Sequence, residues 1–381
     1  MRWALATLLL FWLLPIGSAA AVEATPAPSG ELDRALAGVD QNAWQQAADG
    51  AGVDLDAGAL IGRLAKGEPL GGQDVLAALA DTAMGELRLL LPDLMLLLGP
   101  ALLWAINRQL LTGEGQSLSG AAGYLCYLVE AGVLIRLFGS QAATARQVVM
   151  QMDRLMEFLS PTLAAMLAAV GGASSAAALE PLSAIAGSML STLINRVALT
   201  LSACGAAFAV LGNLNERMTL HNLYKLCKST HNWLLGVAMA GFIGVLTVNG
   251  MMGASRDGLS IRTVRYTVRN MVPAVGREVA DTLDTVVASA LLVKNAAGVT
   301  GLILLVSLCM RPLIHVAMVM LACRLSAALV EPVASGPVTA LIEQFAGVMQ
   351  MLLVALIAGA VLLIVTVGAM LTAGNVIAML R

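Results

Sequence analysis

The residues able to carry chemistry in this sequence are ionisable side chains that interrupt long apolar runs. They are Asp93, Glu130, Arg136, Glu157, Arg196, Lys294, Arg311, Arg324 and Glu343. A charge at the middle of a bilayer costs at least about 2.5 kcal/mol on insertion scales. Each of these side chains should therefore face the interior of a helix bundle, water or a partner protein.

Lys294 is the most informative of these residues, because apolar residues flank it and Asn295 and Gly298 follow it. An asparagine and a glycine permit irregular backbone around a cavity, as in the interrupted helices of transporters. A lysine near the end of a helix can instead extend its ammonium group to the membrane surface. The sequence leaves both interpretations of Lys294 open.

The sequence lacks the patterns of a catalytic or metal site. It has no glycine-rich nucleotide loop, no HExxH motif and no Gly-x-Ser-x-Gly elbow, and its histidines are isolated. The five cysteines are scattered and have no CxxC spacing, which supports neither a disulfide scaffold nor a zinc site. We therefore predict no enzyme activity, no metal ion and no cofactor.

The elements that must position these side chains are membrane helices. Hydrophobic residues make up 59% of the 381 positions and charged residues only 12%, about half of the charged share in a soluble domain. Aromatic residues are scarce at 4%, so Leu, Ala, Val, Ile and Met supply the apolar weight. The fold class predicted from this composition is an all-α, polytopic helical membrane protein.

The chain divides into three predicted parts. Residues 1–21 resemble a secretory signal peptide, with Arg2, a short apolar run and small residues that suit cleavage near Ala20 or Ala21. An uncleaved first anchor is the alternative. Residues 22–86 hold eleven acidic and three basic residues, and we expect a small acidic, helical segment outside the cytoplasm. Residues 87–381 form the membrane helix bundle.

Apolar stretches mark the predicted spans of this bundle. They lie at 89–106, 121–138, 155–173, 181–211, 233–253, 286–310, 313–330 and 345–371. The stretch at 181–211 is interrupted by Asn195 and Arg196, so it is either one tilted helix after an interfacial segment or two short helices. We predict about seven transmembrane helices, or roughly six to eight, from the length needed to cross a bilayer.

The segment 254–285 is predicted to be amphipathic. Arg262, Arg265 and Arg269 recur at helical spacing opposite apolar residues, up to a break near Pro273, which is typical of a helix that lies among lipid headgroups. An ordinary solvated loop helix is the alternative. The loops 213–232 and 254–285 both carry basic residues, so the positive-inside rule leaves the orientation of the last helices open.

A series of short motifs follows in fixed order through the centre of the chain. The motifs are GNLNER from Gly212, GVLTVNG from Gly244, DGLSIRT from Asp257, VPAVG from Val272, DTLDTV from Asp281 and KNAAGVTG from Lys294. Together they resemble the stage III sporulation protein AE family of endospore-forming bacteria. The resemblance is clearest over 211–333, and in 22–86 it extends only to the placement of the segment.

This resemblance implies a non-enzymatic, multi-pass protein of the mother-cell membrane around the forespore. Its partners would be the other stage III sporulation A-operon proteins, including an ATPase and ring-forming subunits, and stage II sporulation protein Q. Together they would form a channel complex. Membrane lipid and further copies of this chain would be additional partners, and nucleic acid would not be one. The alternative function is a stand-alone secondary transporter of a small solute, which the intramembrane charges also permit.

The family has no catalytic residues to carry over to this sequence. The resemblance therefore implies only a shared structural or conducting core at matching positions. These candidate positions are Asp257, Arg262, Pro273, Asp281, Asp284, Lys294 and Asn295.

Overall fold

The regular structure of this protein is helical. The computed structural model describes residues 34–53, 55–67, 84–85, 92, 94–106, 116–214, 220–271, 276–332 and 336–379. Within those ranges there is no β-strand. Five helices are long and apolar enough to cross a membrane, and a shorter apolar helix lies at Leu94–Ile106. These helices confirm the predicted all-α membrane class. The predicted signal peptide at 1–21 lies outside the described residues.

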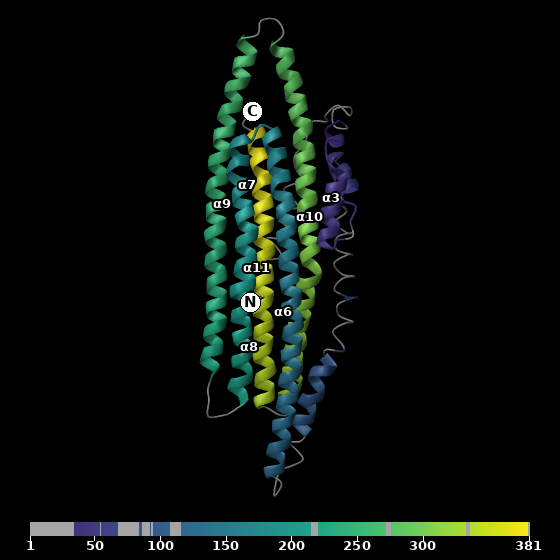
Figure 1. The fold of residues 1–381 in the computed structure, drawn as a ribbon, viewed down its shortest axis with the longest axis vertical. Helices are drawn as coiled ribbons and strands as arrows, with labels where there is room; N and C mark the ends of the chain where they lie inside the picture. The colour runs from purple at the N-terminus through teal and green to yellow at the C-terminus, as the bar shows by residue number, and fades with distance from the viewer. Residues whose placement is uncertain are drawn as a thin grey trace.

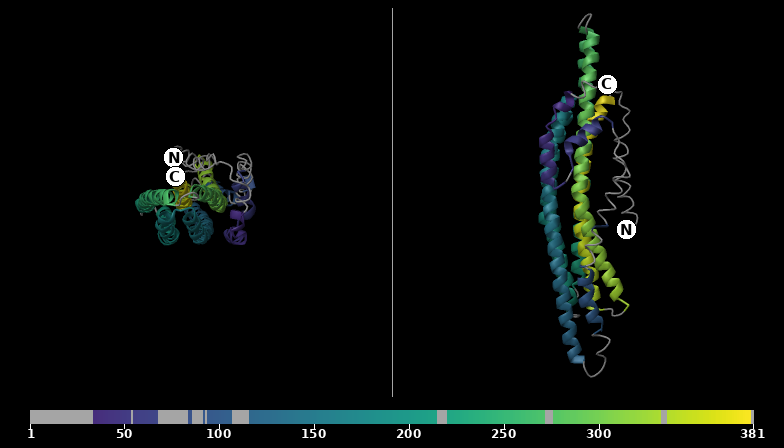
Figure 2. Two further views of the ribbon diagram at one scale, coloured as in Figure 1. Left: turned by 90° about the horizontal axis from the view of Figure 1, so that it is seen from above. Right: turned by 90° about the vertical axis from the view of Figure 1, so that its right-hand side faces the viewer.

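The long helices lie side by side along the long axis of the molecule (Figure 1). The labelled elements are α3 (Gln41–Ala51), α4 (Ala57–Ala65), α6 (Gln116–Ala169), α7 (Ala173–Thr192), the π-helix η1 (Leu193–Ala198), α8 (Leu199–Leu214), α9 (His221–Met271), α10 (Gly276–Val330) and α11 (Pro337–Met379). Seen from above, α11 lies between α9 and α10, with α6 and α7 along one side (Figure 2). The central helix α11 therefore forms the core of the bundle.

Two pairs of predicted spans are joined into single helices. The spans 121–138 and 155–173 fall mostly within α6, whose 54 residues extend about 81 Å at 1.5 Å per residue. Residues 139–154 between them are polar but lack proline, and most are good helix formers. The spans 286–310 and 313–330 are joined in α10 through Pro312. The described residues thus hold five helices that are long enough to cross a membrane, fewer than the predicted seven transmembrane helices. The number is lower because a polar stretch does not by itself end a helix.

The interrupted stretch at 181–211 is one continuous helical rod. Helix α7 passes into η1 and then into α8 without a turn, so the chain is helical from Ala173 to Leu214. Asn195 and Arg196, which mark the interruption in the sequence, both lie in η1. A π-turn accommodates an extra residue inside a helix. The structure therefore favours one crossing here over two short helices.

Helix α9 continues in line through the first half of the predicted amphipathic segment. Its backbone is helical up to Met271, two residues before Pro273, and a proline disfavours helical backbone at the residue before it. Both α9 and α10 project beyond the other helices at that end of the bundle (Figure 1). The segment therefore extends past the bundle instead of lying across it.

Close packing around α11 depends on glycines. A Cβ atom on Gly359 would lie 3.1 Å from Ile194 of η1 and 3.2 Å from Leu190 of α7. On α10, a Cβ on Gly301 would lie 2.9 Å from Leu159 of α6. Small residues let membrane helices approach closely, because packing drives their association where no water remains to be expelled.

Candidate functional site

The structure places the ionisable residues of the apolar runs in two environments. Glu130 and Lys294 are buried inside the bundle. The remaining described ones are exposed on its surface, and these are Arg136, Glu157, Arg196, Arg311, Arg324 and Glu343. Asp93 lies outside the described residues. Across the described part of the chain, no group of three or more His, Cys, Asp or Glu side chains is placed to hold a metal ion.

Lys294 lies at the contact between α10 and α11. Its side chain is 1% exposed, and Nζ donates a hydrogen bond to the backbone oxygen of Leu371 at 2.8 Å. Gly374 provides the space, because a Cβ at that position would overlap Nζ. The lysine therefore points into the bundle and does not reach for the membrane surface. The helix is also continuous through Gly298, so the irregular backbone expected there is absent.

Asn295 adds a second polar contact between the same helices. Its Nδ2 donates a hydrogen bond to Oδ1 of Asn375 at 2.9 Å. Lys294 and Asn295 are adjacent on α10 and bond to α11 residues four apart. Hydrogen bonds of this kind between membrane helices contribute roughly 1 kcal/mol each. The two contacts hold α10 and α11 in a defined register.

Asp257 caps the first turn of α7 from a different helix. It is 2% exposed, and its two carboxylate oxygens accept hydrogen bonds from the backbone N–H groups of Ser174 at 2.8 Å and Ser175 at 2.7 Å. The residue at the N-cap of α7, Gly172, has no side chain to serve this role. A carboxylate there satisfies unpaired N–H groups and lies at the positive end of the helix dipole.

Of the seven candidate core positions, the structure describes the side chains of three, Asp257, Lys294 and Asn295. Lys294 and Asn295 bind α11, whereas Asp257 binds α7. Arg262, Asp281 and Asp284 lie in helical backbone, and their side chains are outside the described part. Pro273 is outside it altogether. A shared conducting core at these seven positions therefore stays a prediction.

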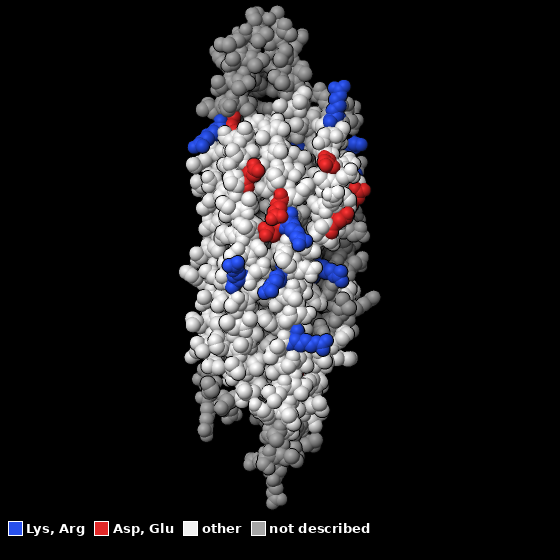
Figure 3. All heavy atoms as spheres, viewed as in Figure 1, with Lys and Arg blue, Asp and Glu red and all other residues white. Residues whose placement is uncertain are grey.

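Helices α6 and α7 carry a charged face that sequence reasoning largely missed. Charged side chains gather over these helices in the middle of the molecule (Figure 3). We define the α6–α7 charged face by its exposed members Arg146, Arg154 and Glu157 on α6, Glu180 on α7, and Arg196 on η1, which continues α7. The spacing of the three α6 members, 8 and then 3 residues, places them within one side of a helix. This spacing in α6 could have been recognised in the sequence. The position of Glu180 beside these residues follows only from the packing of α7 against α6.

Glu130 is a buried acid that has no hydrogen-bond partner among the described residues. Its side chain is 0% exposed, and neither carboxylate oxygen has a hydrogen-bond partner in the structure. It shares the inner face of α6 with Tyr127 and Leu134, which are also buried. Leaving a polar group buried and unpaired costs stability, so Glu130 is a residue that packing alone does not explain.

A polar cluster links α9, α10 and α11 toward the end of the bundle that is opposite to Asp257 and Lys294. Oε1 of Gln350 accepts hydrogen bonds from Lys228 Nζ at 3.2 Å and from Arg324 at 3.3 Å. Tyr224 donates its hydroxyl hydrogen to the backbone oxygen of Gln344 at 3.0 Å. A glutamine from the central helix thus holds one cation from each flanking helix.

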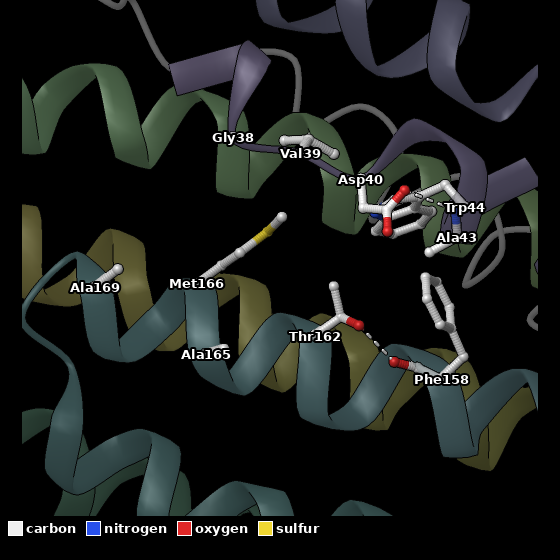
Figure 4. Close-up of a pocket in the computed structure, with 10 residues that line it drawn as sticks. All are labelled: Gly38, Val39, Asp40, Ala43, Trp44, Phe158, Thr162, Ala165, Met166 and Ala169. Atoms are coloured by element: carbon white, nitrogen blue, oxygen red, sulfur yellow. Dashed lines mark hydrogen bonds between the residues drawn. The ribbon is translucent and has the colours of Figure 1, made fainter. Parts of the chain in front are cut away.

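An apolar groove separates α3 from the end of α6. It has a volume of about 360 Å³, and Val39 and Trp44 face Thr162 and Met166 across it (Figure 4). The ring of Trp44 meets Phe158 edge-on, with 5.2 Å between the ring centroids. The groove is therefore the seam along which the N-terminal helices lie on the bundle. The polar side chains in its lining are engaged locally: Asp40 caps α3 by accepting from the backbone N–H of Ala43, and Thr162 donates to the backbone oxygen of Phe158 (Figure 4).

Comparison with known proteins places these features in a family. The family model described as stage III sporulation protein AE matches residues 55–374. A curated relative, stage III sporulation protein AE of Bacillus subtilis (strain 168), is 27% identical over 268 residues, which cover 70% of this chain and 67% of the relative. No solved structure matches this chain. The matched region contains all five long apolar helices except the end of α11 beyond residue 374. The chain belongs to the stage III sporulation protein AE family.

Proposed function

We propose that this protein is a non-enzymatic, multi-pass membrane subunit of the channel complex between mother cell and forespore. In this role it would be required for endospore development after engulfment. Family membership supports the link to sporulation. Five long apolar helices support a place in the membrane. The mother-cell membrane around the forespore is the proposed location.

The observation that carries the subunit role is the α6–α7 charged face. A membrane protein that worked alone would meet lipid on every side, and charges exposed to lipid are costly. This face carries arginines and glutamates on the outside of the bundle. Neighbouring subunits would shelter it from lipid. The proposed neighbours are the ATPase and ring-forming proteins of the stage III A operon and stage II sporulation protein Q.

The transporter hypothesis receives less support. It drew on interrupted helices near the intramembrane charges. Helix α10 is continuous through Lys294, and α6 is continuous through its polar middle. Uptake of a solute by the purified protein alone in liposomes would revive this alternative.

A clean deletion of the gene in its spore-forming host tests the proposed function. We expect development to stop after engulfment, with few heat-resistant spores, and to resume when an intact copy is supplied at another locus. Membrane staining and a forespore reporter identify the stage of arrest. A normal yield of heat-resistant spores from the deletion strain would overturn the proposal.

A further inference from the structure

Helices α7 and α9 are held in register by direct contacts. A Cβ on Gly250 of α9 would lie 3.9 Å from Leu179 of α7, and Asp257 binds the first turn of α7. Glu180 follows Leu179, and Val248 precedes Gly250 by two residues. At 1.5 Å per residue, Glu180 and Val248 therefore lie within about 5 Å of the same height along the bundle.

The α9 side at this height is suited to lipid. Val245, Val248 and Met252 are each about half exposed there. The polar side chains among them, Thr247 and Asn249, donate hydrogen bonds to backbone oxygens of their own helix. Residues 233–253 contain no charged residue, and a stretch of this length can cross the hydrocarbon core. An apolar helix surface of this length without charges is what a bilayer accepts.

The α6–α7 side at the same height is suited to water. Glu180 is exposed there. Helix α6 is in register too, because the hydroxyl of Ser160 donates a hydrogen bond to the backbone oxygen of Glu180 at 3.4 Å. Glu157, three residues before Ser160 on α6, is exposed and lies within about 5 Å of that height. One level of the bundle thus presents apolar side chains on α9 and charged side chains on α6 and α7.

Helix α3 extends the polar side. It lies against α6 through Trp44 and Phe158, and its outward residues Asn42, Gln46 and Asp49 are exposed. These side chains are as unsuited to lipid as the charges beside them. The polar side of the bundle therefore extends over α3, α6 and α7 and consists of several polar and charged side chains.

We propose that the α6–α7 charged face borders a water-filled passage, formed between this chain and its neighbours in the assembly. Ions and small polar solutes are the cargo that a surface with both signs of charge would admit. This inference rests on the proposed function for its neighbours. The contrast between the two sides of the bundle does not depend on it.

The charges themselves favour water over a protein partner or a second copy. Across the described residues, none of the five members of the face forms an ion pair with another. The centre of a protein interface is depleted in charged residues. Hydration satisfies all five charges at once.

Cysteine labelling in the sporulating host tests this proposal. The parent is the full-length protein with its five cysteines replaced by alanine or serine, and it must restore sporulation to the deletion strain. Single cysteines are placed at Ala177 and Ala184, which are exposed on α7 within four residues of Glu180, and at Val245 and Val248 on α9 as matched controls. A membrane-impermeant charged thiol reagent is applied to membrane vesicles of both orientations, and labelling after denaturation confirms that each cysteine is present.

We expect at least tenfold faster labelling at Ala177→Cys and Ala184→Cys than at Val245→Cys and Val248→Cys. Equal labelling at all four positions would show that this level lies outside the bilayer, and protection of all four would show that no water reaches the face. Either result overturns the passage. Ser188→Cys and Met252→Cys, at positions that are also exposed, replace any variant that fails to accumulate. The deletion strain reports on the sporulation role separately, so labelling and spore yield can fail independently.

Discussion

At the scale of single residues, three buried polar side chains bond to the main chain of other helices. Lys294 binds the oxygen of Leu371, Tyr224 binds the oxygen of Gln344, and Asp257 binds two N–H groups of α7. A backbone partner is present whatever side chain occupies its position. Each of these contacts therefore depends on the identity of one residue, which makes the polar residue the informative one to change.

Asp257→Ala should destabilise the protein by about 1–2 kcal/mol, the usual cost of removing a helix cap. The change leaves the N–H groups of Ser174 and Ser175 without their acceptors. Thermal unfolding of the purified protein in detergent measures the effect. Arg256→Ala, at an exposed neighbour, is the control and should unfold like the parent. An unchanged melting temperature for Asp257→Ala would show that the cap carries no stability.

Lys294→Met should leave folding intact and reduce sporulation. A methionine has a similar length and fits the apolar surroundings, and the Leu371 oxygen lies within α11, where the helix can supply a donor. Buried charges in membranes are costly and mark functional positions, so we expect normal protein levels with at least a tenfold loss of heat-resistant spores. Lys225→Met, at an exposed lysine on α9, should sporulate normally. Full sporulation of the Lys294 variant would assign the lysine to packing.

The local sequence predicted Lys294 but not the contacts of Asp257. An apolar stretch around a lysine is visible within ten residues, and burial follows from the cost of exposing charge to lipid. The acceptor role of Asp257 depends on a helix start 83 residues away. No pattern within α9 contains that information, because it arises only when α7 and α9 pack together.

At the scale of elements, apolar stretches located the helices but did not separate them. All the predicted spans from 121 to 371 fall within helices or at their ends. The error was to treat residues 139–154 and Arg311-Pro312 as loops. Polar residues on one side of a helix maintain hydrogen bonding along the backbone, and one proline removes a single bond. A continuous helix and a helix–loop–helix therefore share the same hydropathy profile.

Gly298→Ala should weaken the α10–α11 contact, whereas Gly368→Ala should not. An added Cβ at Gly298 would overlap the side chain of Leu371, and one at Gly368 would meet no atom within 4 Å. We expect Gly298→Ala to destabilise by about 1–3 kcal/mol, as for other overpacked sites. Gly368→Ala should be neutral or stabilising, because alanine favours helix more than glycine. Thermal unfolding of both variants under the same conditions checks this difference, and equal melting temperatures would contradict it.

At the scale of the whole molecule, the structure links segments whose orientation the sequence left open. Helix α3 packs on the C-terminal part of α6 through Phe158. The short turn after α6 leads into α7, whose first residues bind Asp257 near the far end of α9. The N-terminal helices and the end of α9 therefore lie toward the same end of the bundle, and the end of α8 and the start of α9 lie at the opposite end (Figure 1).

This arrangement predicts membrane topology from one assumption. If the signal peptide carries α3 and α4 across the membrane, then the arginine-rich connection between α9 and α10 lies on the same outer side, against the usual bias of arginine towards the cytoplasm. The end of α11 lies toward that end too (Figure 1). Paired reporters, one active only outside the cytoplasm and one only inside, should therefore agree for fusions after 67, within 272–275 and at the C-terminus. A fusion within 215–219 should report the cytoplasm. A cytoplasmic reading for 272–275 together with an outer reading after 67 would contradict the packing of α3 on α6.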